Sequence, residues 1–422
     1  MKNPRSDVLD EVFERFLQGS DIFRDRDVLR HDYIPSKLPH RESEIRYLGE
    51  IVAPALKGSP FSNVLIYGKT GTGKTAVMRY VLSMLKRKAE QLGSPMKARF
   101  VNCRLTGTEY RVFSNLCSAI GVRVPFTGLA LGEVFDRFKE GLDSKKLLLI
   151  VVLDEIDAIV KNRGDFLLYE LTRINESLTK SKVTIIGISN DLRFKELLDP
   201  RVLSTLSEEE ILFKPYNADE LRDILVERAE LAFCSGVLSD GAIRLCSALA
   251  AAEHGDARRA LDLLRVAGEL AEREGSGSVS EAHVRRAEKR IEHDRISEAL
   301  KNLPTHSKIV MLSVYLLSRA EAGHSVTGNI YNVYCELCQE MGIIPLTQRR
   351  VSGLINELDV IGLLNTRVVS LGRYGRTKKI HLAIPRSFVR NVFCEDDRFG
   401  SLVDYAPRYL ASSMKRSARM RF

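Results

Sequence analysis

Residues 68–75 constrain this chain more than any other segment, because they fit the phosphate-binding pattern G-x-x-x-x-G-K-[ST] at every fixed position. A strand-like apolar run at 63–67 leads directly into this loop, and a helical stretch at 76–91 follows it. In that context the backbone N–H groups of the loop turn inward around a phosphate at the helix N-terminus. An ordinary glycine-rich turn is the alternative, but it would not require this order of elements. The loop therefore predicts a nucleoside triphosphate site.

Within this loop the residue types have separate chemical roles. Lys74 can reach the β- and γ-phosphates, and the Thr75 hydroxyl can ligate Mg²⁺. The predicted cofactors are accordingly ATP or ADP, with Mg²⁺. The loop residues predicted to bind the cofactor are Gly68, Thr70, Gly71, Thr72, Gly73, Lys74, Thr75 and Ala76.

A second motif follows a continuous apolar run at 147–153, which is typical of a parallel strand buried on both faces. Asp154 and Glu155 come directly after it. The carboxyl ends of such strands form the crevice in which α/β sheets bind ligands. We therefore expect Asp154 to hold the Mg²⁺ shell with Thr75, and Glu155 to orient or deprotonate a water. A strand that simply ends in solvated acids is the alternative.

A further apolar run at 183–188 places Asn190 at the same sheet edge, where its amide can hydrogen-bond a γ-phosphate or the attacking water. Strands that alternate with helical stretches, such as 166–178, predict an α/β fold with a doubly wound parallel sheet. Arg201 follows in a turn. It is predicted either to reach a γ-phosphate in a neighbouring subunit or to be an ordinary surface arginine.

A small helical domain is predicted next. Asn217 begins a capping-box variant and a helix that runs to about Ala232, and Ser239 and Asp256 are typical N-caps of two more helices. Arg258 and Arg259 stand in the first turn of the last helix, against the preference of the helix dipole for acids. We expect Arg258 to face the nucleotide and report γ-phosphate occupancy through a helical lid, and Arg259 to be simply solvated.

Beyond Pro304 the pattern is that of a winged helix. Helical stretches at 305–322 and 328–341 precede a third helix capped by Thr347, and β-rich runs at 364–371 and 378–384 flank a glycine-rich tip. A solvated basic turn is the alternative for the tip. The residues predicted to face DNA are Gln348, Arg349, Arg350 and Ser352 of the helix, and Arg373, Tyr374, Gly375 and Arg376 of the tip.

The net charge of +9 agrees with an acidic partner such as nucleic acid. The chain lacks an opening signal segment and a membrane-length apolar run, so we expect a soluble cytoplasmic, nucleoid-associated protein without a membrane partner. The seven cysteines do not form a disulfide pattern. Cys335 and Cys338 share one helix face, and core packing is favoured over a metal site because no second ligand pair accompanies them.

Taken together, the phosphate loop, the acid pair Asp154-Glu155, Asn190, Arg201 and the segment Gly255-Asp256-Ala257-Arg258 resemble the AAA+ ATPases. The motif Tyr33-Ile34-Pro35, with Leu38-Pro39-His40-Arg41-Glu42, is similar to the N-terminal signature of archaeal initiators of the origin-recognition and cell-division-cycle family. The resemblance covers about 15–395. It implies that Tyr33, Ile34, Pro35 and His40 contact the adenine or ribose, although a proline-rich linker is the alternative.

Between the two phosphate-site motifs, 104–138 resembles the helical insertion of that initiator branch. The resemblance implies that Arg123, Phe126, Thr127 and Gly128 touch duplex DNA, while a packed connector is the competing interpretation. It also implies that Arg201 need not act between subunits, because archaeal members often act as monomers on DNA.

The predicted domains are an AAA+ domain with an N-terminal extension at 1–215, a lid at 216–300, a winged helix at 301–395 and a basic tail at 396–422. The leading hypothesis is a replication initiator that binds double-stranded origin DNA, hydrolyses ATP slowly as a regulatory switch, and contacts the replicative helicase and other initiator copies. A DNA-remodelling motor with brisk turnover and a signalling ATPase whose winged helix binds proteins are the alternatives.

Overall fold

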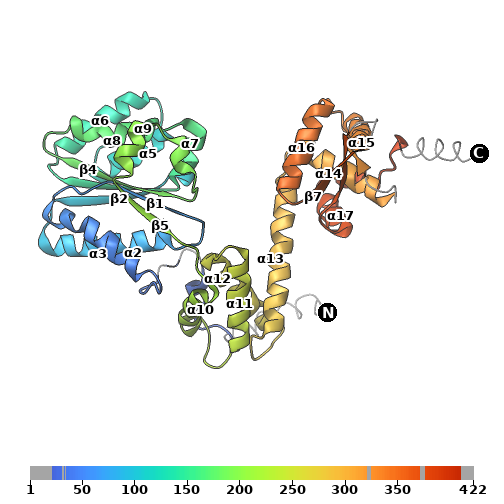
Figure 1. Cartoon of the computed structure of the whole chain (residues 1–422), viewed down its shortest axis with the longest axis horizontal. Helices are drawn as coiled ribbons and strands as arrows, with labels where there is room; N and C mark the ends of the chain where they lie inside the picture. The colour runs from blue at the N-terminus through green and yellow to red at the C-terminus, as the bar shows by residue number, and fades with distance from the viewer. Residues whose placement is uncertain (1–20, 31–32, 34, 321–324, 371–375, 410–422) are drawn as a thin grey trace, which may run out of the picture. The chain divides into compact units, whose positions relative to one another are not determined.

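The computed structural model describes residues 21–30, 33, 35–320, 325–370 and 376–409. The chain divides into two units, 1–287 and 288–422, and each is described by itself. The first unit contains the predicted nucleotide motifs and the helical lid, and the second contains the winged helix (Figure 1).

A five-stranded, all-parallel sheet with the order β2-β3-β4-β1-β5 forms the centre of the first unit. Its strands are β1 (Val64–Gly68), β2 (Met96–Asn102), β3 (Leu148–Asp154), β4 (Lys182–Ser189) and β5 (Glu209–Phe213). β3 is buried along its whole length because helices cover both faces of the sheet. Leu149, Val151 and Leu153 point into one apolar core, and the residues that alternate with them point into the other. The doubly wound sheet predicted from the sequence is therefore confirmed.

Helices lie in two layers on this sheet, as Figure 1 shows. On one face lie α2 (Glu42–Val52) and α3 (Lys74–Leu92), together with η2 (Ala53–Lys57). On the other face lie α4 (Cys103–Thr106), α5 (Glu109–Ile120), α6 (Leu131–Asp143), α7 (Ile156–Arg163), α8 (Phe166–Arg173), η3 (Ile174–Glu176), η4 (Phe194–Leu197) and α9 (Pro200–Leu206). The helix expected over 166–178 is shorter than predicted: the α-helix ends at Arg173 and only a 3-10 turn follows.

The lid consists of α10 (Ala218–Ala232), α11 (Asp240–Glu253), α12 (Ala257–Arg273) and the start of α13 (Glu281–Lys301). All three predicted N-caps are confirmed: Asn217 forms a reciprocal capping box with Glu220, Ser239 caps α11, and Asp256 caps α12. Upstream residues that the sequence left unassigned pack on this lid through η1 (Asp27–Leu29) and through a β-bridge between Phe23 and Phe233. The two rings are tilted by 30°, with centroids 4.8 Å apart.

The second unit has the winged-helix order of elements. Its helices are α14 (Thr305–Arg319), α15 (Thr327–Glu340) and α16 (Gln348–Val360), and its antiparallel sheet, in the order β6-β8-β7, contains β6 (Ser325–Val326), β7 (Leu364–Ser370) and β8 (Arg376–Leu382). β6 and the later α17 (Arg386–Cys394) and η6 (Gly400–Leu402) were not predicted. The described start of the expected tail is folded, since Phe399 and Val403 are buried in this unit.

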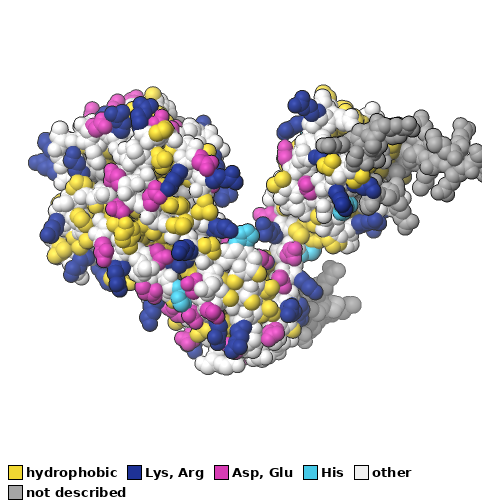
Figure 2. Space-filling view, viewed as in Figure 1, with side chains coloured by type: hydrophobic (Ala, Val, Ile, Leu, Met, Phe, Trp, Pro, Cys, Tyr) yellow, Lys and Arg dark blue, Asp and Glu magenta, His cyan; other side chains and the backbone are white. Residues whose placement is uncertain are grey.

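Most of the charged side chains lie on the surface, outside these apolar cores. On the face shown in Figure 2, the Lys and Arg side chains of the first unit are interspersed with Asp and Glu, so the net positive charge is not gathered into one basic stripe there. No helix within the described parts of the chain is long and apolar enough to cross a bilayer.

Candidate nucleotide site and DNA-contact surfaces

The phosphate loop joins β1 to α3 and packs closely against the lid. Gly71 and Gly73 have left-handed backbones, with φ of 70° and 91°. A Cβ on Gly71 would lie 1.7 Å from Oδ1 of Asp256, and a Cβ on Gly73 would lie 2.8 Å from the Tyr216 hydroxyl. The N–H of Ala257 donates to the carbonyl of Gly71 at 3.1 Å. These glycines are therefore needed for the approach of the lid as well as for the shape of the loop.

Lys74 is buried at the start of α3. Its Nζ donates to the carbonyls of Gly68 at 2.7 Å and Lys69 at 2.6 Å. The pKa of Lys74 is lowered to about 8: burial is the main cause, the carboxylate of Asp154 opposes it, and the positive charge of Arg258 adds to it. The site thus holds a partly desolvated cation where a phosphate would be its natural partner.

Two oxygen groups meet beside Lys74. The Thr75 hydroxyl donates to Asp154, with Oγ1 3.1 Å from Oδ2, and burial raises the pKa of the Asp154 carboxyl. A hydroxyl and a carboxylate this close fit the hard oxygen ligands that Mg²⁺ prefers. Glu155 follows at the N-terminus of α7 with a left-handed backbone (φ 53°, ψ 46°). Such a conformation is costly for a non-glycine residue and is typical of functional sites.

Asn190 is held at the end of β4 by an acid that sequence reasoning did not assign. Oδ1 of Asp157 accepts hydrogen bonds from the Ser189 hydroxyl and from the Asn190 backbone N–H, both at 3.2 Å. Asp157 therefore links α7, which begins beside the acid pair, to the strand that carries Asn190. The sequence signal was present, since Asp157 stands two residues after Glu155.

A cavity of about 520 Å³ opens between the phosphate loop, the N-terminal segment and the lid. The predicted site residues that line it are Tyr33, Pro35, Gly71, Thr72, Gly73, Lys74, Thr75, Ala76, Asp154, Glu155, Asn190 and Arg258. Lining residues that were not predicted include Arg30, Arg79, Arg104, Tyr216 and Arg228. Gly68, Thr70, His40 and Arg201 do not line it, and Ile34 lies outside the described residues.

The N-terminal segment is attached to lid helix α10 next to this cavity. The guanidinium of Arg228 lies 4.5 Å from the ring centroid of Tyr33, and its Nη1 donates to the carbonyl of Val28 at 3.0 Å. His40 points to α10 instead of the cavity, with Nε2 2.8 Å from Oδ2 of Asp223. An aromatic ring and an arginine at one end, with the phosphate loop at the other, suit a purine nucleotide.

The two arginines at the start of α12 have different environments. Arg258 lines the cavity, and its backbone N–H is capped by Oδ1 of Asp256 at 2.8 Å. Arg259, which was expected to be simply solvated, forms two hydrogen bonds with Glu253 at 2.9 and 3.1 Å, and its side chain is only 18% exposed. That expectation is wrong because the neighbouring helix α11 supplies an acid.

Arg201 lies at the start of α9 and away from the cavity. Its side chain is 74% exposed and pairs with Asp199, with Nε 3.1 Å from Oδ1. Both interpretations of this residue stay predictions.

On the winged helix, α16 buries Val351, Leu354, Ile355 and Leu358. Its other side exposes Gln348, Arg349 and Arg350, with Ser352 partly exposed. Arg373, Tyr374 and Gly375 lie outside the described residues, and Arg376 begins β8. The helix thus presents a polar and basic face, as its sequence pattern predicts.

The predicted insertion at 104–138 contains α5, the loop that follows it and the first part of α6. The predicted DNA-contact residues lie in that loop. The backbone of the loop is held by the Tyr110 hydroxyl, which donates to the carbonyl of Pro125 at 2.7 Å. The predicted DNA-contact residues of this loop, Arg123, Phe126, Thr127 and Gly128, are all exposed. Phe126 is 74% exposed, and the guanidinium of Arg111 lies 5.3 Å from its ring centroid. An exposed aromatic ring beside an arginine is suited to nucleic acid.

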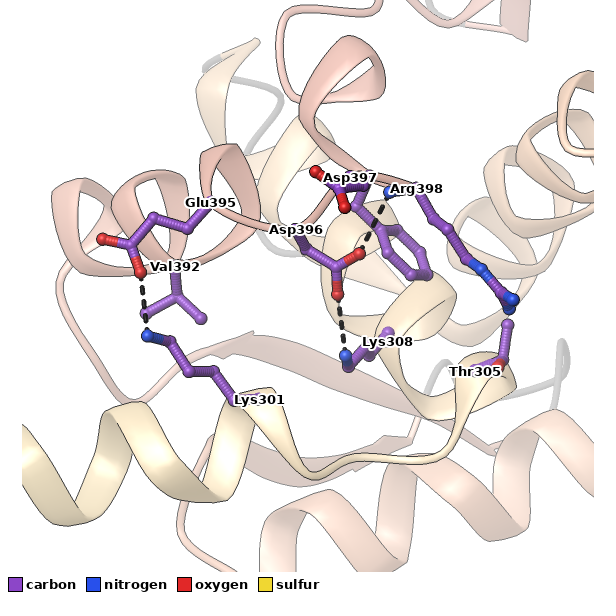
Figure 3. Close-up of a pocket in the computed structure, with 9 residues that line it drawn as sticks. Lys301, Thr305, Lys308, Val392, Glu395, Asp396, Asp397 and Arg398 are labelled. Carbon is purple, nitrogen blue, oxygen red and sulfur yellow. Dashed lines mark hydrogen bonds and ion pairs between the residues drawn. The ribbon is translucent and has the colours of Figure 1, made fainter.

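A second cavity, also of about 520 Å³, lies in the winged-helix unit (Figure 3). Its charges are largely satisfied internally: Lys301 pairs with Glu395 and Lys308 with Asp396, each at 2.8 Å. These ion pairs join the C-terminal end of α13 and the first turn of α14 to the segment after α17. We therefore interpret this cavity as part of the packing of the unit. Cys338 is buried in the hydrophobic core of the same unit and Cys335 packs against that core, which supports core packing for this pair.

A phosphate loop, an acid pair at the end of β3, Asn190 at the end of β4 and a helical lid that brings Arg258 to the cavity define an AAA+ ATPase. The sequence matches three family descriptions in this order: an AAA domain at 61–195, a Cdc6 AAA+ ATPase-type lid domain at 222–289 and a CDC6 C-terminal winged helix domain at 298–392.

Similarity to known proteins extends over nearly the whole chain. The ORC1-type DNA replication protein of Thermococcus onnurineus is 49% identical over 416 residues, which cover 98% of this chain and 99% of the relative. That of Pyrococcus furiosus is 52% identical over 392 residues, or 92% and 93% of the two chains. The solved structure of the Aeropyrum pernix ORC1 protein in complex with DNA matches with a TM-score of 0.82 and 51% identity, covering 91% of this chain and all of that one. The chain belongs to the family of ORC1-type DNA replication proteins.

Proposed function

We propose that this protein is a replication initiator that binds duplex origin DNA through its winged helix and its AAA+ domain, with the bound nucleotide acting as a conformational switch. The observation that carries the proposal is the shared wall of the nucleotide cavity: Gly71 of the phosphate loop accepts a hydrogen bond from Ala257 of the lid, and Arg258 follows directly. A change in the bound phosphates therefore acts on core and lid together.

Each residue of the nucleotide site has a separate proposed role. Lys74 and the loop N–H groups bind phosphate, and Thr75 and Asp154 would hold Mg²⁺, which would neutralise phosphate charge. Glu155 accepts a proton from, or orients, the attacking water, and Asn190 fixes that water or the terminal phosphate. Arg258 lines the cavity from the lid. Its guanidinium pairs with the terminal phosphate, which only a triphosphate supplies, and so distinguishes a triphosphate from a diphosphate. Slow turnover suits a switch, since each state then persists.

The DNA contacts proposed are the exposed face of α16, the hairpin tip and the insertion loop around Phe126. The exposed arginines of α16 and the exposed Phe126 support two of these surfaces, and the arginines in the sequence of the tip support the third. The structure of the Aeropyrum pernix ORC1 relative in complex with DNA supports DNA binding in general. The remaining proposed partners are the replicative helicase and other copies of the initiator, with the chromosome in the cytoplasm as the place of action.

Footprinting on archaeal origin fragments tests this function. The protein with ATP should protect specific positions on origin DNA at concentrations that leave random duplex of the same length unprotected. Equal protection of both duplexes would contradict origin recognition. A closed ring with fast, DNA-stimulated turnover would instead indicate a remodelling motor.

A further inference from the structure

Arg41 is a buried arginine at the N-cap position of α2, and it joins three parts of the first unit. Its Nε donates to the carbonyl of Thr72 in the phosphate loop at 3.0 Å. One terminal nitrogen donates to the carbonyl of Lys214 at 2.7 Å, and the other to the carbonyl of His40 at 2.9 Å. The nearest carboxylate, that of Glu44, is 3.5 Å away. Backbone carbonyls, not a close ion pair, therefore receive most of the hydrogen bonds of this buried cation.

Tyr216 lies directly against this guanidinium, with the ring centroid 3.8 Å from Cζ of Arg41. It belongs to the short connection between β5 and α10, residues 214–217, which joins the sheet to the lid and which we call the hinge. Its hydroxyl leaves no room for a side chain at Gly73, and its backbone N–H donates to the carbonyl of Gly255 at 3.3 Å. Gly255 immediately precedes Asp256, the N-cap of α12, and Arg258 follows two residues after that cap. The stacked pair thus contacts the phosphate loop, the hinge and the start of α12.

We infer that Arg41 is a positioning residue of the nucleotide site: stacked on Tyr216, it holds the phosphate loop, the hinge and the N-terminus of α12 in one register, so that Arg258 reaches the phosphates. This inference rests on the proposed role of Arg258. An arginine is required because its planar fork donates in three directions at once, whereas the ammonium of lysine is a compact charge that cannot span the same carbonyls.

If Arg41 positions Arg258, the effects of changing the two residues on ATP affinity should not be additive. A double-mutant cycle measures this coupling. The full-length variants Arg41→Lys, Arg258→Ala and the double variant would be compared with the unaltered protein by titration with ATP and with ADP. Each single change should weaken ATP binding by about tenfold, the size expected for one lost charge-assisted hydrogen bond. ADP binding should change less, and the double variant should bind ATP no more weakly than either single one.

Arg46→Lys is the matched control, since Arg46 is an exposed arginine on the same helix α2 and should leave the ratio of ATP to ADP affinity unchanged. If Arg41→Lys does not fold, Tyr216→Leu tests the same stack from the hinge side and should also be non-additive with Arg258→Ala.

Three results would overturn the inference: a lower unfolding temperature of Arg41→Lys with an unchanged ATP to ADP ratio, multiplicative effects in the double variant, or no effect of Arg258→Ala. Footprinting separates this failure from failure of the proposed function. If the unaltered protein still protects origin DNA in an ATP-dependent way, the proposed function stands. The first two results then refute only the role of Arg41, and the third also refutes the role of Arg258.

Discussion

The ammonium of Lys74 has exchanged water for two loop carbonyls, and burial lowers its pKa from the ordinary 10.5 to about 8. Near pH 8 a large share of the nucleotide-free protein therefore carries a neutral lysine. Bound phosphates are anionic and favour the charged form, so they raise this pKa. We expect nucleotide binding at pH 8 to take up a fraction of a proton, and the affinity to fall as the pH rises through about 8.

Calorimetry at pH 8 in two buffers of different ionisation enthalpy measures this uptake directly. The apparent binding enthalpies should differ in proportion to the buffer enthalpies, and Lys74→Arg, if it binds, should abolish the difference because arginine stays charged. Equal enthalpies in both buffers for the unaltered protein would show that Lys74 is already fully protonated.

Glu155 lines the cavity beside Asp154 with a strained backbone, and its carboxylate is the proposed acceptor of a proton from the attacking water. Glu155→Gln keeps the shape of the side chain but removes that basicity. We expect turnover to fall by about a hundredfold or more, with ATP affinity retained. Steady-state hydrolysis and equilibrium binding measure the two effects. Glu176→Gln, at an exposed acid away from the cavity, should leave turnover unchanged, and full turnover in Glu155→Gln would refute the assignment.

The sequence predicted the site residues whose neighbours are fixed by a local motif. Lys74, Thr75 and Asp154 were predicted because a phosphate loop and a buried strand place them without knowledge of the rest of the fold. Arg41 and Arg228 were missed because their partners, such as Lys214 for Arg41, are far away in the sequence. Only the folded chain brings those carbonyls within hydrogen-bonding distance.

Elements were predictable where a long apolar run or a capping residue marked them. β3 and α10 are examples: one is a continuous buried strand and the other begins at a capping box. β6 has only two residues and exists because it pairs with β8, so no periodic pattern can reveal it. The early end of α8 is similar, since Asn175 just beyond it exchanges hydrogen bonds with the backbone of Val183 in β4.

The N-cap of α12 shows how one element end serves two purposes. Asp256 caps the helix and also fills the space above Gly71. Asp256→Ala should lower the free energy of unfolding by about 1 kcal/mol, the usual effect of a lost cap. It should also weaken ATP binding, because the first turn that carries Arg258 loses its anchor.

Ser239→Ala is the matched control for this prediction, since Ser239 caps α11 in the same lid but does not line the cavity. Chemical denaturation and ATP titration of both variants separate the two effects. A similar loss of stability is expected in both, and weakened ATP binding only in Asp256→Ala. Equal ATP affinity in the two variants would show that this cap matters for stability alone.

For the molecule as a whole, the fold class and the two separate binding functions followed from the order of motifs along the chain. The contacts that couple core to lid did not, because they join residues far apart in the sequence, such as Gly71 and Ala257. The N-terminal segment adds to them, since it packs on the lid at Phe233 and on the core at Thr72. A segment that reads as an extension in the sequence is thus a structural link in the first unit.

The winged helix offers the last prediction, which concerns DNA binding by the full chain. Arg349 and Arg350 are exposed on α16, and each phosphate contact contributes a slope of about −0.9 to the dependence of log affinity on log salt. If both arginines contact phosphates, the variant with both changed to Ala should bind duplex less tightly, with a slope shallower by about 1.8. Affinities measured by fluorescence anisotropy over a range of salt concentrations give this slope. ATP affinity should not change, and the pair Arg386→Ala with Arg390→Ala on α17 is the control of equal charge. An identical slope in the α16 and α17 variants would remove α16 from the DNA interface.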